Sequence, residues 1–165
     1  MEPLTEKEIR AAFVNCTKGE AKRLYVPRDL AEQPWSDLDY LGWRDPQAHD
    51  RAYLVIEGDD GRPRAVALRS SSHAVGQSRR SMCTMCLTTH SGGVSLLVAR
   101  KAGKAGQQGS SVGAYMCSDL ACSLYVRGKR DAGIGARLHE TITLEEKIRR
   151  TGANVAAFVA KVGTA

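Results

Sequence analysis

The sequence lacks the features that would place the protein in a membrane or send it out of the cell. No run of about 18 apolar residues occurs among the 165 residues, so no segment is expected to span a bilayer. The N-terminal stretch is charged and amphipathic, without the apolar region of a secretory signal. We therefore expect a cytoplasmic protein with no membrane partner, in which the five cysteines stay reduced.

Common catalytic motifs are also missing. The sequence has neither a P-loop nor a G-x-G-x-x-G motif, and no order of serine, histidine and aspartate suggests a catalytic triad. The four histidines are scattered along the chain without paired spacing. We expect a protein that is not an enzyme and has no small-molecule substrate.

Acidic residues are scarce in the middle of the chain. Residues 76–130 hold eight lysines or arginines but a single acid, Asp119, which gives this segment a net charge of +7. A one-sided charge of this kind favours anionic partners such as nucleic acid or an acidic protein surface. A solvated face that keeps the protein soluble is the alternative explanation.

The pattern of apolar and capping residues predicts an α+β fold. Capping boxes that begin at Thr5 and Thr143 predict helices near the two ends of the sequence. Residues 35–43 contain both tryptophans, and we expect this segment to cover a sheet. Four strands of a small antiparallel sheet are expected at residues 53–57, 64–69, 94–100 and 112–116.

Four cysteines are spaced as two pairs of metal ligands. Cys83 and Cys86 form a C-x-x-C knuckle, and Cys117 and Cys122 lie near the predicted start of a short helix. Four thiolates in a tetrahedron favour one structural zinc ion and leave no open position for catalysis. A knuckle, a β-hairpin and a short helix in this order are the parts of a treble-clef zinc finger.

Other interpretations of the cysteines stay open at this point. They could be free thiols in the core, or they could hold an iron–sulfur cluster. His90, four residues after Cys86, could also replace Cys122 in a zinc site with three cysteines. We favour four cysteine ligands, and we expect His90 to be exposed in a turn.

These elements predict a single domain over residues 1–165. It has three parts: an N-terminal helix plus β-hairpin at 1–75, the treble-clef zinc finger at 76–130, and a C-terminal helix at 131–165.

Longer stretches of the sequence resemble a known family. Residues 13–20 (FVNCTKGE), 38–46 (LDYLGWRDP) and 115–122 (YMCSDLAC), together with the C-x-x-C pair, are similar to the C-terminal treble-clef zinc-finger domain of the elongation factor G-binding proteins. The resemblance covers nearly the whole chain. It implies that Cys83, Cys86, Cys117 and Cys122 bind one structural Zn²⁺.

The resemblance also implies a function at the ribosome. Members of this family bind elongation factor G and promote its release from the ribosome, and the best-known members confer fusidic acid resistance. Those members carry an N-terminal helical domain that these 165 residues do not contain. Direct binding of ribosomal RNA by the treble clef is the alternative function.

Basic and aromatic residues near the cysteines are the candidate partner contacts. One group lies on a loop that we expect to be mobile because it contains Gly103, Gly106 and Gly109. The other group follows Cys122, and tyrosine and arginine are enriched at binding hot spots. The candidates are Arg100, Lys101, Lys104, Tyr125, Arg127, Lys129 and Arg130.

Overall fold

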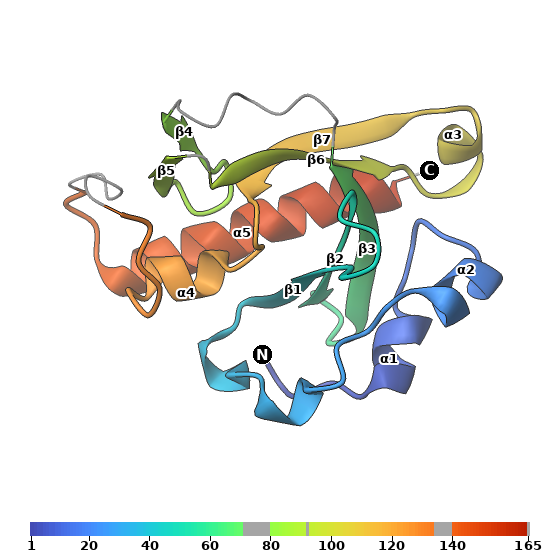
Figure 1. The fold of residues 1–165 in the computed structure, drawn as a ribbon, viewed down its shortest axis with the longest axis horizontal. Helices are drawn as coiled ribbons and strands as arrows, with labels where there is room; N and C mark the ends of the chain where they lie inside the picture. The colour runs from blue at the N-terminus through green and yellow to red at the C-terminus, as the bar shows by residue number, and fades with distance from the viewer. Residues whose placement is uncertain (71–79, 92, 134–139, 165) are drawn as a thin grey trace.

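The computed structural model describes residues 1–70, 80–91, 93–133 and 140–164. These residues form a five-stranded antiparallel sheet of order β1-β2-β3-β6-β7 and a separate two-stranded sheet, β4-β5 (Figure 1). The predicted α+β fold with an antiparallel sheet is therefore confirmed. The strands are β1 (Tyr40–Arg44), β2 (Arg51–Glu57), β3 (Pro63–Ser70), β4 (Arg80–Met82), β5 (Thr89–Ser91), β6 (Val94–Arg100) and β7 (Ser111–Cys117).

Helices cover both faces of the larger sheet. Capping boxes begin three of them, at Thr5, Thr17 and Thr143, where each threonine side chain accepts a hydrogen bond from the backbone N–H of a glutamate three residues later. The helices are α1 (Glu6–Ala11), α2 (Lys18–Arg23), α3 (Gly103–Gln107), α4 (Cys122–Val126) and α5 (Leu144–Gly163), with 3-10 turns η1 (Leu30–Glu32) and η2 (Trp35–Asp37).

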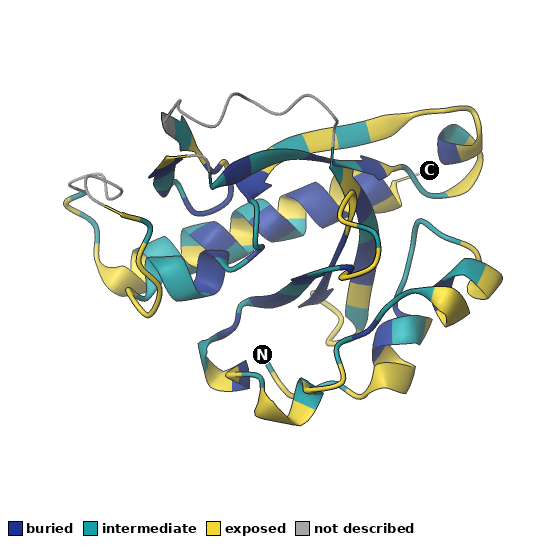
Figure 2. Cartoon of the chain, viewed as in Figure 1, coloured by how far each residue is buried: buried dark blue, intermediate teal, exposed yellow. Residues whose placement is uncertain are grey.

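The core has two parts, one on each face of the sheet (Figure 2). On one face, α5 buries Val155, Phe158 and Val159 against strand residues such as Leu54 and Leu97. On the other face, α1 and the turns η1 and η2 pack against the alternate residues of β1 and β2. Because successive strand residues point to opposite faces, each central strand contributes to both parts of the core.

The tryptophan-containing segment differs from the prediction. It was expected to cover a sheet, but Tyr40–Arg44 is itself the edge strand β1, paired with β2. Only the preceding turn η2, with buried Trp35, covers the sheet. The alternation of the strand explains the difference: Leu41 and Trp43 face the α1 side of the core, and Tyr40 faces the α5 side.

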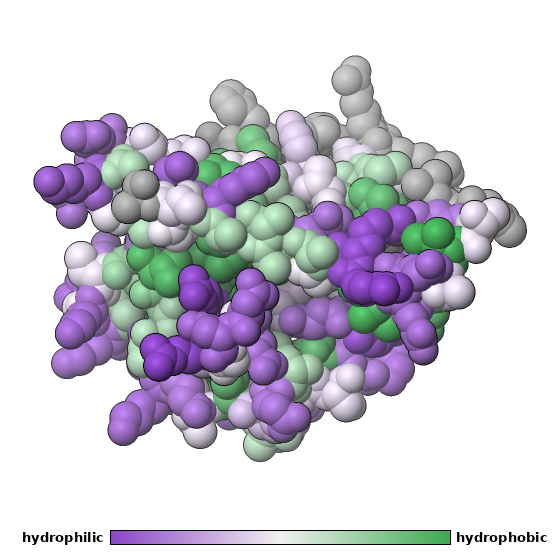
Figure 3. Space-filling view, turned by 180° about the vertical axis from the view of Figure 1, so that it is seen from behind, coloured by the Kyte–Doolittle hydropathy of each residue, from purple (hydrophilic) through white to green (hydrophobic). Residues whose placement is uncertain are grey.

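The surface gives two further observations. Within the described residues, none of the helices has the length and apolar character that crossing a lipid bilayer requires. Figure 3 shows the back of the molecule, where an area of hydrophobic side chains is bordered by hydrophilic ones.

The predicted boundary between residues 75 and 76 lies outside the described residues.

Candidate metal centre

The first cysteine pair lies in a tight knuckle between β4 and β5. The knuckle is closed by two backbone hydrogen bonds: Leu87 N–H donates to the Cys83 carbonyl (2.9 Å) and Cys83 N–H donates to the Thr88 carbonyl (2.9 Å). The Met85 N–H lies 3.4 Å from the Cys83 sulfur and donates to it. Leu87 has a φ of 57°, which is strained for a leucine and brings the chain back immediately after Cys86.

The second pair lies where β7 turns into α4. Cys117 is the last residue of β7 and Cys122 is the first residue of α4. Between them, Leu120 also takes a positive φ, 59°, and its N–H donates to the Cys117 carbonyl (2.9 Å). Asp119 accepts a hydrogen bond from Ala121 N–H (3.1 Å) within this turn, and α4 begins directly after Ala121.

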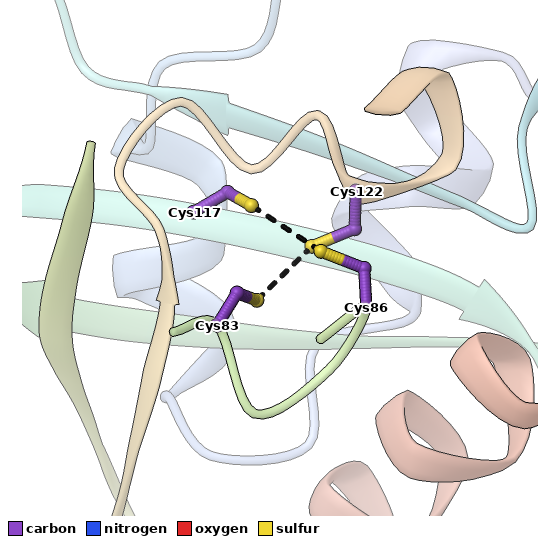
Figure 4. Close-up of side chains that lie close together, drawn as sticks. All are labelled: Cys83, Cys86, Cys117 and Cys122. Atoms are coloured by element: carbon purple, nitrogen blue, oxygen red, sulfur yellow. Dashed lines mark hydrogen bonds between the residues drawn. The ribbon is translucent and has the colours of Figure 1, made fainter. Parts of the chain in front are cut away.

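The four sulfur atoms converge in the core (Figure 4). All of them lie within 4.8 Å of one another, with Sγ–Sγ distances of 3.6 Å for Cys83–Cys122 and 3.5 Å for Cys86–Cys117. Zn–S bonds of about 2.3 Å place the sulfurs of a tetrahedral site about 3.8 Å apart, close to the distances here. A disulfide, at about 2.05 Å, is far shorter, and the cysteines are free.

The charge state of the sulfurs also fits a divalent cation. Hydrogen bonds from Cys117 and Cys122 lower the pKa of the Cys83 thiol, whereas the contact with Cys122 raises the pKa of the Cys117 thiol. Four thiolates this close together in the core would repel one another strongly unless a cation lay between them. A zinc ion between them stabilises four thiolates together, so the site holds one structural Zn²⁺, as predicted.

Two polar groups surround the sulfurs. His90 was expected to be exposed, but it is buried, with its Nε2 atom 3.3 Å from the Cys117 sulfur. The buried Tyr40 hydroxyl has no hydrogen-bond partner among the described residues. Burial is the main cause that raises the pKa of Tyr40 well above its usual value, and the neighbouring Cys122 thiol adds to the effect. Both groups are suited to donate to thiolates and so to stabilise a bound zinc ion.

Strand β1 holds the second cysteine pair in place. Tyr40, Gly42 and Arg44 alternate along β1 and lie on the face toward the turn between the two cysteines. The Arg44 Nε–H donates to the Ser118 carbonyl (2.6 Å). A Cβ atom on Gly42 would lie 2.5 Å from the Leu120 Cβ atom, so only glycine lets the turn approach this closely.

The sequence matches the family described as the FBP C-terminal treble-clef zinc-finger over residues 8–162. The chain belongs to this family. Its treble clef consists of the knuckle with Cys83 and Cys86, the β6–β7 hairpin and helix α4. The resemblance drawn from the sequence motifs is thus confirmed.

The fold of this FBP-type domain also matches a solved structure, that of the fusidic acid resistance protein FusC. The TM-score is 0.63 at 16% sequence identity, a level at which the similarity shows a shared fold. The match covers 98% of this chain and 60% of FusC, so the chain spans less than two thirds of that protein. No curated protein sequence is similar enough to this chain to count as a match.

The structure separates the predicted contact residues of the FBP-type domain into two groups. Arg100 and Lys101 lie at the end of β6 and Lys104 lies in α3, at the end of the β6–β7 hairpin near the C-terminal end of α5 (Figure 1). The loop contains the short helix α3, which was not predicted. Gly106 is buried there, and a Cβ atom on it would overlap the Lys101 carbonyl. Gly106 therefore permits tight packing, whereas Gly103 and Gly109 supply the positive φ angles of this loop.

The second group lies on and beyond α4, beside the zinc site, and its charges are paired. Arg127 binds Asp39 through two hydrogen bonds of 2.7 and 2.9 Å, and both side chains are mostly buried. Lys129 contacts Asp37 at 2.6 Å. These two pairs join α4 to the segment that leads into β1. Neutralisation by acids leaves this surface much less positive than the sequence suggests.

The other two residues of this group form a cluster around one carboxylate. Asp119 accepts a hydrogen bond from the Tyr125 hydroxyl (2.8 Å) and lies 3.3 Å from Arg130. The Tyr125 ring packs edge-on against His90, with ring centroids 4.6 Å apart. Tyr125 is thus part of the support of the metal centre.

Sequence reasoning missed a cleft beside the zinc site. We call it the zinc-side cleft. Its volume is about 300 Å³, and among its lining residues Leu144, at the first turn of α5, is 50% exposed. Leu144 starts the apolar face of α5, so its exposure could not be read from periodicity. The lining residues are Cys86, Leu87, Thr88, Tyr125, Val126, Arg127, Glu140, Leu144 and Lys147.

Proposed function

We propose that this zinc-binding, FusC-like protein binds elongation factor G through the zinc-side cleft and modulates its release from the ribosome. Membership of the FBP C-terminal treble-clef family and the fold shared with a fusidic acid resistance protein support this proposal. Binding alone accounts for this function. A zinc ion with four thiolate ligands has no open position for substrate, so we propose no catalysed reaction, and we place the protein in the cytoplasm.

The zinc-side cleft is the observation that carries the proposal. It combines apolar side chains, Leu87, Val126 and Leu144, with a rim of charged groups that includes Arg127 and Glu140. An apolar centre with a polar rim is the usual anatomy of a protein–protein interface. The zinc ion fixes the cleft, because Cys86 forms part of its wall and Leu87 follows directly.

A binding titration with purified elongation factor G tests the proposal. Leu144→Asp places a carboxylate in the apolar part of the cleft, and we expect at least about tenfold weaker binding. The fold should tolerate this change, because Leu144 is half exposed and an acid at the first position of a helix is favourable. Glu145→Ala, an exposed neighbour outside the cleft, is the matched control and should bind normally.

Release is measured separately, by co-sedimentation of elongation factor G with ribosomes in fusidic acid, with and without the protein. Equal binding by the Leu144→Asp variant would contradict the proposed surface. A lack of binding by the unmodified protein, together with tight binding of ribosomal RNA in a gel-shift assay, would contradict the function. The acid-paired arginine and lysine beside the zinc make RNA binding at this surface the weaker candidate.

A further inference from the structure

A second and larger cleft lies on the opposite face of the sheet, away from the zinc site. Its volume is about 510 Å³, and it opens between α2 and the ends of strands β2, β3, β6 and β7. Four guanidinium groups line it, from Arg23, Arg51, Arg69 and Arg100, and Glu20 is the acid among the lining residues. We call this site the arginine cleft.

The strand register places three of these arginines side by side. Arg51 on β2 lies directly opposite Arg69 on β3, and Arg69 lies opposite Val98 on β6. Arg100 follows Val98 by two residues and so points to the same face. This is the face that α1 covers further along the sheet, where Tyr53 is buried, but all three arginines are exposed.

Among the residues that the structure describes, carboxylates do not balance this charge. Arg51 and Arg69 are directly opposite each other on paired strands, and like charges in such positions destabilise the pairing. Asp50 lies 3.7 Å from Arg69, but both side chains are more than half exposed. The Glu20 carboxylate accepts a hydrogen bond from the Thr17 backbone N–H, which is the largest cause that lowers its pKa, and the charges of Arg100 and Arg23 lower this pKa further.

The chemistry of the arginine cleft selects the ligand class. A guanidinium fork matches both carboxylate and phosphate, but a phosphate has enough oxygens to accept from several forks at once. The volume lies within the range of about 300–1,000 Å³ typical of ligand sites. Leu24 and Val98, both half-buried, add apolar surface for the rest of a ligand.

We propose that the arginine cleft binds a phosphate-bearing ligand, either the backbone of an RNA strand or a free nucleotide. The proposal does not depend on elongation factor G, because the cleft shares none of its lining residues with the zinc-side cleft. It also places any contact with RNA away from the zinc ion, on the sheet face beside α2.

Fluorescence anisotropy with a labelled single-stranded RNA oligonucleotide tests the proposal, with GTP and inorganic phosphate as competitors. The test variant is Arg51→Gln/Arg100→Gln, and the matched control is Arg28→Gln/Arg62→Gln. The control removes the same charge from exposed positions outside the cleft. Thermal unfolding of each variant checks that the fold is intact.

We expect the test variant to bind about a hundredfold more weakly, about tenfold per lost arginine, and the control to bind within about twofold of the unmodified protein. The slope of log K against log salt should fall by roughly one per arginine that contacts a phosphate. RNA binding that millimolar GTP does not displace identifies an RNA strand as the ligand. Displacement by GTP, or direct GTP binding that depends on the two arginines, identifies a nucleotide.

Three outcomes would overturn the proposal. The first is an equal loss of affinity in the test variant and the control, which would show general attraction to positive charge. The second is no binding of RNA or GTP. The third is equally effective competition by polyglutamate, which would identify a carboxylate ligand. Binding of elongation factor G is measured in parallel, and the test variant should retain it.

Discussion

The contact between strand β1 and the second pair of zinc ligands predicts the effect of one added methyl group. In Gly42→Ala, the new Cβ atom would lie 2.5 Å from the Leu120 Cβ atom and 3.2 Å from the Leu120 carbonyl oxygen. Carbon atoms in contact are normally about 3.5–4.0 Å apart, so the strand or the turn must move by about 1 Å or more. Leu120 lies between Cys117 and Cys122, and the movement therefore reaches the zinc ligands.

The magnitude follows from two opposing effects. Overpacking of a close contact costs about 1–3 kcal/mol. Alanine also lowers the conformational entropy of the unfolded chain, which stabilises the folded protein by about 0.4–1 kcal/mol. The expected net loss of about 1–2 kcal/mol corresponds to a melting temperature lower by roughly 3–6 °C for a domain of this size. Displaced ligands should also weaken zinc binding by about tenfold, the low end of the effect of changes around a metal site.

Helix α5 provides a matched control, a glycine-to-alanine change that should stabilise the protein. A Cβ atom on Gly152 would meet nothing within 4 Å among the described residues, and the position is helical. Gly152→Ala should therefore raise the free energy of unfolding by up to about 1 kcal/mol. The assays are thermal unfolding and zinc transfer to a colorimetric chelator. A Gly42→Ala protein with normal stability and normal zinc retention would refute the reasoning.

Two further predictions concern pairs of side chains. Asp39→Asn removes the carboxylate that pairs with mostly buried Arg127 and should lower the free energy of unfolding by about 2 kcal/mol in urea titrations, whereas exposed Asp59→Asn should change it little. Hydrogen bonds from Thr143 hold the pKa of Glu146 below 4.5. The stabilisation that the ionised Glu146 gives the folded protein is present above about pH 4.5 and is lost as the pH falls through the lowered pKa of the folded state. Glu146→Gln should therefore be less stable than the unmodified protein at pH 7 and equally stable in acid. A stability difference that stays constant across pH would contradict this.

Features fixed by residues close together in the sequence could be predicted. The capping box at Thr143 involves four consecutive residues, and α5 begins where it indicates. The C-x-x-C knuckle is equally local, since the spacing of Cys83 and Cys86 limits where both sulfurs can point. The pairing of this knuckle with Cys117 and Cys122 was predictable because two closely spaced cysteine pairs, each at a predicted turn or helix start, are the usual ligand pattern of one zinc site.

Features that join distant parts of the chain could not be predicted. Tyr40 and Gly42 look like members of an aromatic packing segment, and only the pairing of β1 with β2 places them beside the zinc ligands. Asp39 and Arg127 are 88 residues apart, so no local pattern indicates that they form an ion pair. His90 lies in a polar sequence typical of an exposed turn, yet the β4–β5 hairpin buries it against Cys117.

The same distinction explains why charge along the sequence misleads about charge in space. The segment 76–130 is strongly basic, but Arg127 and Lys129 are paired with acids from the more acidic N-terminal part. Arg100, from the same basic segment, instead joins Arg51 and Arg69, which come from that N-terminal part. Positive charge is therefore offset beside the zinc ion and accumulates in the arginine cleft. An apolar protein contact suits the first surface and a phosphate suits the second, so variants in one cleft should leave binding at the other unchanged.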